Sequence, residues 1–159
     1  DLANIFFEYG ELRESRKIAK TIVSARKKKQ ILTTNQLLDC IQHLTIERKR
    51  NQFFSRVFQA IRIEVNDEIQ ALKEMLNAAT DLLKAGGRLS VISYHSLEDR
   101  LVKNLVKKGN VEGNLQRDFY GNPLKIFKEI SKKVIVPSEQ EIKTNPRARS
   151  AKLRIAEKI

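Results

Sequence analysis

The sequence predicts an α/β protein that is helical over its first half and mixed in its second half. Apolar residues recur at helical spacing in three stretches between residues 11 and 85. Gly86-Gly87 ends the last stretch, because glycine readily takes the left-handed conformation that stops a helix. The apolar run Leu89–Tyr94 then predicts a strand buried on both faces, as in a parallel sheet, and a helix over Leu97–Lys108 follows it.

The first part of the chain predicts three helices. A short helix is expected over Asp1–Tyr9, where Gly10 ends it, and a longer one over Glu11–Lys29. Thr33-Thr34 offers an N-cap for a third helix over Asn35–Leu44.

A polar and basic hinge at residues 47–50 predicts a domain boundary, with a helical domain over 1–50 and a second domain over 51–159. The second domain begins with a helical pattern over Asn51–Ala85. This pattern is longer than an average globular helix, so we expect a bend or a break near Val65-Asn66-Asp67.

The last fifty residues predict two further strands. Residues 109–123 are rich in Gly and Asn and predict a loop, and Ser138 is expected to cap a short helix. The strands are expected over Leu124–Ile130 and Ala151–Ile159, on either side of a basic turn at 145–150. The inward positions are predicted to be Leu124, Ile126 and Ile130 in the first strand, and Leu153 and Ile155 in the second.

The chain is strongly basic, with 31 Lys and Arg against 19 Asp and Glu and a formal net charge of +12. This predicts a polyanionic partner, nucleic acid first and an anionic membrane surface second. The cations gather on one side of the predicted helix over residues 11–29. A solvated helix face is the simpler interpretation, but charge of nearly one sign destabilises a helix that has no partner. The candidate contacts to a nucleic-acid backbone are Arg13, Arg16, Lys17, Lys20, Arg26, Lys27, Lys28 and Lys29.

The single cysteine, Cys40, excludes an internal disulfide and fits a reducing cytoplasm. Cys40 and His43 lie one helical turn apart, but two ligands make a poor metal site, so a structural role and no metal are expected. Neither an apolar run of membrane-spanning length nor a signal peptide is visible. The chain begins inside a predicted helix, and we interpret it as a fragment of a longer protein.

The loop Tyr94-His95-Ser96 follows the predicted strand at its carboxyl end, where ligands bind in open α/β sheets. Ser96 is expected to cap the following helix, with Glu98 and Asp99 in its first turn. In the simpler interpretation these acids only cap the helix or pair with arginines, Arg62 or Arg100, and His95 is a surface residue. No phosphate-binding glycine loop or serine-hydrolase elbow accompanies the loop.

Three stretches together resemble the RsmH (MraW) family: Phe58–Glu68, Gly86–Arg100 and Asn145–Arg154. Tyr9–Glu11 and Arg16–Ala19 also resemble the start of that family's inserted helical domain. Members are S-adenosylmethionine-dependent methyltransferases that modify N4 of a cytosine in bacterial small-subunit ribosomal RNA. The resemblance covers essentially the whole chain and is carried by long motifs in the family's order.

The resemblance implies that the chain is the second half of a Rossmann-like class I methyltransferase sheet, preceded by a helical insertion domain. The family's glycine-rich cofactor loop, its ribose-binding acid and its catalytic segment precede the insertion and are not in this sequence. S-adenosylmethionine is therefore expected in the full-length protein and not on this fragment, which is expected to be inactive alone.

The implied partner is small-subunit ribosomal RNA in the cytoplasm. A non-enzymatic basic RNA-binding module and a self-associating helical hairpin are the alternatives. Half of a sheet also leaves a strand edge exposed, which predicts a homo-oligomer of the fragment. The candidates for the substrate pocket are Tyr94, His95, Ser96, Asn145, Arg147 and Arg149.

Overall fold

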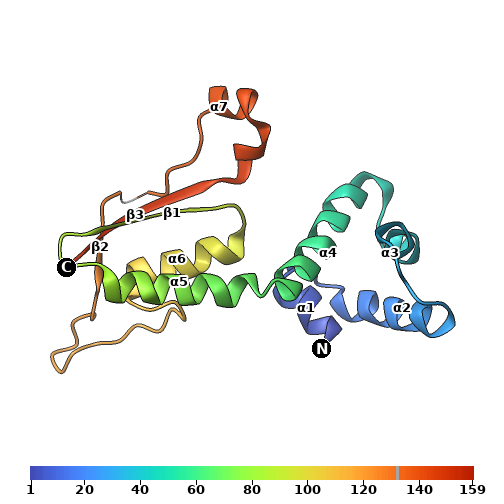
Figure 1. The fold of residues 1–159 in the computed structure, drawn as a ribbon, viewed down its shortest axis with the longest axis horizontal. Coiled ribbons are helices and arrows are strands. Elements are labelled where there is room, and N and C mark those ends of the chain that lie inside the picture. Colours follow the sequence, from blue (N-terminus) through green and yellow to red (C-terminus); the bar gives the residue numbers. More distant parts are fainter. Residues whose placement is uncertain (132) are drawn as a thin grey trace. The chain divides into compact units, whose positions relative to one another are not determined.

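The computed structural model describes residues 1–131 and 133–159, and the chain forms two compact units (Figure 1). Unit 1 is Asp1–Glu68 and unit 2 is Ile69–Ile159. The sequence predicted this boundary after residue 50. The division falls later because the helix that begins at Arg50 packs into the core of unit 1.

Unit 1 contains four α-helices: α1 (Leu2–Glu8), α2 (Ser15–Lys28), α3 (Thr34–Ile41) and α4 (Arg50–Val65). Two short 3₁₀ helices, η1 (Gln42–Leu44) and η2 (Glu47–Lys49), connect α3 to α4. Their apolar faces form one core, whose fully buried members include Phe6, Ile18, Ile41, Val57 and Ala60. The three helices predicted before residue 50 are confirmed.

Local chemistry explains how two of these helices begin. Gly10 is required between α1 and α2, since a Cβ there would lie 2.8 Å from the Phe6 carbonyl oxygen. Glu11 follows with φ of 50°, so α2 begins at Ser15 rather than at Glu11. Thr33 caps α3 in a reciprocal capping box with Gln36, as the threonine pair predicted.

The long helical pattern breaks where the sequence predicted. Helix α4 ends at Val65, Asp67 takes the left-handed conformation with φ of 50°, and α5 begins as Glu68–Leu82. Arg62 spans the break with two hydrogen bonds to the Glu68 carboxylate, of 2.7 and 2.9 Å. The break is therefore a defined turn.

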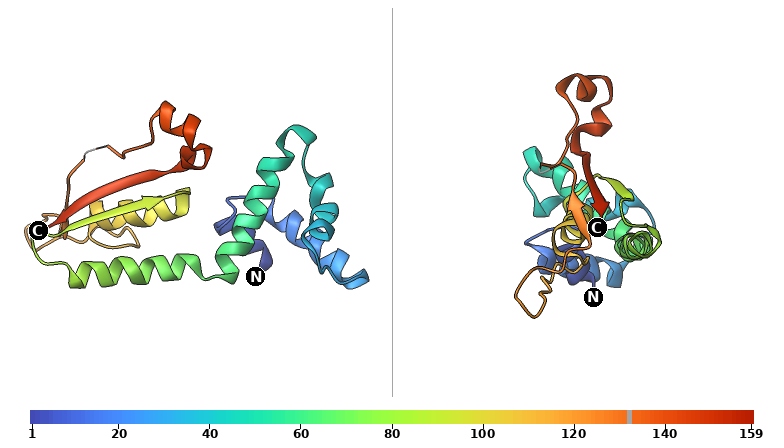
Figure 2. Two further views of the ribbon diagram at one scale, coloured as in Figure 1. Left: turned by 45° about the horizontal axis from the view of Figure 1, so that its top comes forward. Right: turned by 90° about the vertical axis from the view of Figure 1, so that its left-hand side faces the viewer.

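Unit 2 is a three-stranded sheet with two long helices packed against it. The strands are β1 (Arg88–Ser93), β2 (Phe127–Glu129) and β3 (Lys152–Lys158), in the order β1-β3-β2. Helix α5 and helix α6 (Ser96–Lys108) run along the sheet (Figure 2). The short helix α7 (Glu139–Thr144), which Ser138 caps as predicted, and η3 (Pro146–Ser150) precede β3.

The sheet corrects the predicted pairing and burial of its first strand. Strand β1 pairs antiparallel with β3, and no strand among the described residues pairs with its other edge. Leu89 and Val91 pack against the core shared with α5 and α6, but Ser90 and Ile92 on the other face are exposed, Ile92 by 58%. The prediction of burial on both faces is therefore wrong for the chain as described.

The predicted inward positions of the last two strands are also wrong, except for Ile126, which packs against the core of unit 2. Phe127 and Ala156 are buried in the core, whereas Leu124 and Ile130 are 49% and 44% exposed. The register pairs Val91 with Arg154 and Leu89 with Ala156, so the even-numbered residues of β3 face the helices. Leu153 and Ile155 lie on the opposite face, where Leu153 pairs with Ile135.

Within the described part of the chain, no helix is both long and apolar enough to cross a bilayer.

Candidate functional site

The cations proposed to contact nucleic acid cover the exposed side of α2. The buried side of this helix consists of Ser15, Ile18, Ala19 and Ile22, which pack into the unit 1 core. All eight candidates lie outside this stripe and are exposed: Arg13, Arg16, Lys17, Lys20, Arg26, Lys27, Lys28 and Lys29. Helix α2 therefore presents a row of positive charge to solvent. We call these eight residues the basic face.

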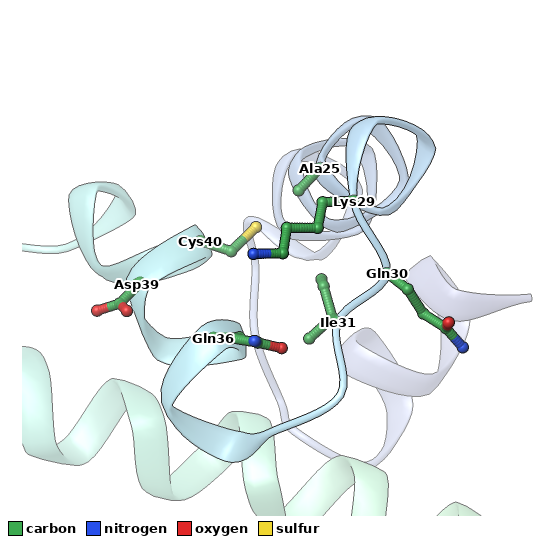
Figure 3. A pocket seen from close by; sticks show the side chains of 7 residues that line it. All are labelled: Ala25, Lys29, Gln30, Ile31, Gln36, Asp39 and Cys40. Atoms are coloured by element: carbon green, nitrogen blue, oxygen red, sulfur yellow. The ribbon is translucent and has the colours of Figure 1, made fainter.

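A pocket of about 350 Å³ lies at the carboxyl end of the basic face, between α2 and α3. Figure 3 shows the Lys29 side chain directed toward Cys40, with Ile31 and the Gln36 amide below it in this view. The Cys40 thiol lies 3.8 Å from the Thr21 carbonyl oxygen, and burial raises the pKa of Cys40. These contacts support a structural role for this cysteine. Among residues 1–131 and 133–159, no three His, Cys, Asp or Glu side chains gather as metal ligands.

The turn between β1 and α6 is held by His95, not by Ser96. His95 is the N-cap, and its Nδ1 accepts a long hydrogen bond of 3.4 Å from the Glu98 backbone N–H. In return the Glu98 carboxylate accepts hydrogen bonds from the backbone N–H groups of Tyr94, at 2.8 Å, and of His95, at 3.3 Å. The prediction that Ser96 caps the helix is therefore wrong, because Ser96 is already the first residue of α6. The prediction that Glu98 serves the cap is confirmed.

The environment of Glu98 strongly favours its ionised form. Burial raises the pKa of this carboxyl. The hydrogen bond with the His95 side chain and those from backbone N–H groups outweigh this effect, and they lower the pKa from 4.5 to about 2. His95 Nε2 lies 3.2 Å from Glu98 Oε1, and the imidazole is only 11% exposed. His95 therefore acts as a fixed part of the turn in this structure.

Asp99 joins the same turn to β3. Arg154 donates two hydrogen bonds to its carboxylate, at 2.7 and 3.2 Å, and Lys152 Nζ lies 3.6 Å away. Burial raises the pKa of Asp99. The hydrogen bonds and charge of Arg154, and then of Lys152, outweigh this effect, so the pKa is lowered overall. The sequence had suggested Arg62 or Arg100 as arginine partners. Instead, Arg62 pairs with Glu68, and Arg154 holds Asp99.

The two segments that carry the six candidates for a substrate pocket adjoin one end of the unit 2 sheet along the chain. Ser93, the last residue of β1, pairs with Lys152, the first residue of β3. Ser93 Oγ also lies within hydrogen-bond distance of the Lys152 carbonyl oxygen, at 3.4 Å. The segments that adjoin this pair are Tyr94, His95 and Ser96 on one side, and Asn145, Arg147 and Arg149 on the other.

Most of these candidates are exposed and present polar groups to solvent. Tyr94 is 55% exposed, and Ser96, Asn145, Arg147 and Arg149 are exposed as well. Ala148 is buried between the two arginines and anchors η3. This end of the sheet thus offers a phenol, a hydroxyl, an amide and two guanidinium groups, which suit binding of a polar anionic ligand.

The family described as the MraW methylase family matches residues 1–159. Ribosomal RNA small subunit methyltransferase H of Bacteroides thetaiotaomicron is 58% identical over 157 residues, covering 99% of this chain and 52% of that protein. The protein of the same name from Flavobacterium johnsoniae is 54% identical over 159 residues, covering 100% of this chain and 52% of the relative. The chain thus spans about half the length of these relatives. Because the match extends along all of its residues and confirms the resemblance in the sequence, the chain belongs to the MraW methylase family.

Proposed function

We propose that the protein to which this chain belongs transfers a methyl group from S-adenosylmethionine to N4 of a cytosine in small-subunit ribosomal RNA, in the cytoplasm. The family match over residues 1–159 is the observation that carries this proposal. The relatives bear the name of a ribosomal RNA small subunit methyltransferase. The cytosine and its N4 atom follow from the family resemblance of the three motifs.

The two units have different tasks in this proposal. Unit 1 acts as the helical insertion, whose basic face holds the phosphate backbone of the RNA. Unit 2 acts as the second half of the Rossmann-like class I methyltransferase sheet. The unpaired edge of β1 supports this assignment, because a larger sheet would continue there.

The end of the unit 2 sheet serves the target base. Methylation of an exocyclic amine requires the base to leave its stack and enter a polar pocket. The exposed ring of Tyr94 offers a surface for base stacking, and Arg147 and Arg149 offer charge to the flanking phosphates. The cap formed by His95 and Glu98 keeps the Tyr94 backbone in one conformation.

The turn at Tyr94–Ser96 does not fit S-adenosylmethionine. The strand-to-helix turn at Tyr94–Ser96 contains no glycine that would let a ligand approach the backbone closely. The N–H groups of Tyr94 and His95 are also engaged, because both donate hydrogen bonds to the Glu98 carboxylate. We therefore assign cofactor binding to the part of the protein outside this chain.

The decisive experiment is a methyl-transfer assay on small ribosomal subunits. The full-length protein should label one cytosine, identified as N4-methylated by mass spectrometry of the digested RNA. The 159-residue chain should give no label. Label on another atom or another RNA would contradict the proposal.

A non-enzymatic RNA-binding module is the second candidate, and the net charge of +12 with an exposed basic face favours it. The same assay separates the two candidates. A full-length protein that binds small-subunit RNA but transfers no methyl group would support the binding module instead.

A further inference from the structure

An open pocket of about 650 Å³ lies between α1 and the beginning of α2. An aromatic ring and three cations line it: Phe7 from α1, Arg13 from the connecting turn, and Arg16 and Lys17 from α2. Its volume lies within the roughly 300–1,000 Å³ that is usual for ligand pockets. The pocket belongs entirely to unit 1 and lies at the amino end of the basic face, far along α2 from Lys29.

Phe7 is the unusual member of this pocket. Its neighbour Phe6 is fully buried and anchors α1 in the core, while Phe7 is 60% exposed. The unit 1 core therefore does not require the Phe7 ring. A large exposed ring beside several cations suits single-stranded nucleic acid, in which bases stack on aromatic side chains while Arg and Lys hold the phosphates.

The pocket also contains two carboxylates, Glu8 and Glu14. The Glu14 side chain makes no capping hydrogen bond to α2, so its carboxylate is not committed to the helix. These acids reduce the attraction for a bare phosphate, and they accept hydrogen bonds from base amino groups or ribose hydroxyls. The mixture of ring, cations and acceptors favours a nucleotide over a simple anion.

We propose that this pocket holds one unstacked base of the RNA substrate against the Phe7 ring, with the adjoining phosphates on Arg13, Arg16 and Lys17. Lys20 lies one turn beyond Arg16 on α2, so the phosphate path continues from the pocket along the basic face. The pocket would fix the register of the RNA on unit 1, apart from the methylated base. This inference rests on the proposed function, because it takes its RNA partner from it.

The test uses Phe7→Trp as a local reporter, since the chain has no tryptophan. A base stacked on the indole should quench its fluorescence when a short single-stranded RNA is titrated at low salt. An abasic oligomer with the same number of phosphates should bind with little quenching, and inorganic phosphate should cause none. Phe119→Trp is the matched control, because Phe119 is 98% exposed on a loop of unit 2 and should not respond.

A second measurement separates stacking from charge. Phe7→Ala should weaken RNA binding about 5- to 150-fold, as expected for loss of one stacked base, without changing the salt dependence. Arg16→Gln should instead reduce the slope of log affinity against log salt by roughly 0.7. Circular dichroism of both variants should match the unsubstituted chain, since both side chains are exposed.

The outcomes distinguish this inference from the proposed function. Salt-dependent RNA binding that leaves the Phe7→Trp emission unchanged would overturn the stacking pocket and leave RNA methylation untouched. Equal quenching by the abasic oligomer would overturn base recognition. If neither the chain nor the full-length protein binds RNA, the inference and the proposed function both fail.

Discussion

Replacing Glu98 by Gln should loosen the turn that joins β1 to α6. The carboxylate accepts hydrogen bonds from the N–H groups of Tyr94 and His95, and the substitution keeps the shape while removing the charge. A glutamine amide also directs N–H donors toward these backbone donors in one of its two orientations. The variant should therefore exchange the amide hydrogens of residues 94–99 faster than the unsubstituted chain does.

The lowered pKa of Glu98 sets the size of this effect. A pKa of about 2 in the folded chain, against 4.5 for the free group, corresponds to about 3 kcal/mol of folding stability as an upper bound. The Glu98 side chain is 28% exposed, so water screens part of this energy. We expect about 1–2 kcal/mol at pH 7, which is roughly a 5- to 30-fold increase in exchange rate.

The stabilisation by Glu98 should decrease in acid. Because the folded pKa is lowered, the stabilisation is present at pH 7 and is lost as the pH falls from about 4.5 toward 2. Hydrogen exchange measured by mass spectrometry at pH 7 and pH 3 should therefore show a difference between the two proteins that shrinks in acid. Glu112→Gln, on an exposed loop residue, is the matched control and should change little. A Glu98→Gln difference that is absent at pH 7, or equal at both pH values, would refute the reasoning.

Four further predictions concern the ion pair, the basic face, the cofactor and the sheet edge. Asp99→Asn should destabilise unit 2 by on the order of 3 kcal/mol in urea denaturation, because it leaves the Arg154 charge partly buried without its partner; an unchanged midpoint would contradict this. Replacing Arg26, Lys27, Lys28 and Lys29 together by Gln should flatten the salt dependence of RNA binding between about 50 and 200 mM, and an unaltered slope would make them a solvated surface only. Calorimetric titration of S-adenosylmethionine into the chain should detect no binding, whereas micromolar binding would mean that the cofactor pocket has been misassigned. Sedimentation at several concentrations should detect a dimer or a higher oligomer formed through the open edge of β1, and a monomer throughout would exclude this.

The helices were predictable because their signals are local. The break between α4 and α5 and the threonine cap of α3 each depend on residues within one or two turns. The faces of the strands were not predictable in this way. In β3, Leu153 and Ile155 alternate with Lys152 and Arg154, so the pattern predicts that the two apolar residues face the core.

The structure reverses this assignment because the helix-facing side of β3 carries the charges. Arg154 reaches Asp99, and Lys158 donates a hydrogen bond to the Thr80 carbonyl oxygen in α5. Only Ala156, with a small side chain, occupies the centre of the core from this strand. Period-two alternation alone cannot distinguish the two faces when long charged side chains end in ion pairs. Arg154, which the sequence did not single out, is one of the even-numbered residues of β3 and therefore faces Asp99.

The substrate pocket itself stays a prediction, and only the local structure of its two candidate segments can be compared with the sequence. The loop at the end of β1 and the basic turn before β3 do adjoin one pair of residues, Ser93 and Lys152. The cap could not be assigned from propensity, because serine is a far more common N-cap than histidine. His95 takes the role since Glu98 lies three residues later and completes the capping box.

The central position of β3 in the sheet has a consequence for how the protein is made. Ser93 and Lys152 are 59 residues apart, and β1 has no other strand partner among the described residues. At about 5–20 residues per second, a ribosome needs roughly 3–12 s between synthesising these two residues. Unit 1, built from neighbouring helices, can fold during that time, while the edge of β1 that pairs with β3 stays open. Slower translation over residues 94–151 should lengthen this interval and lower the yield of soluble protein.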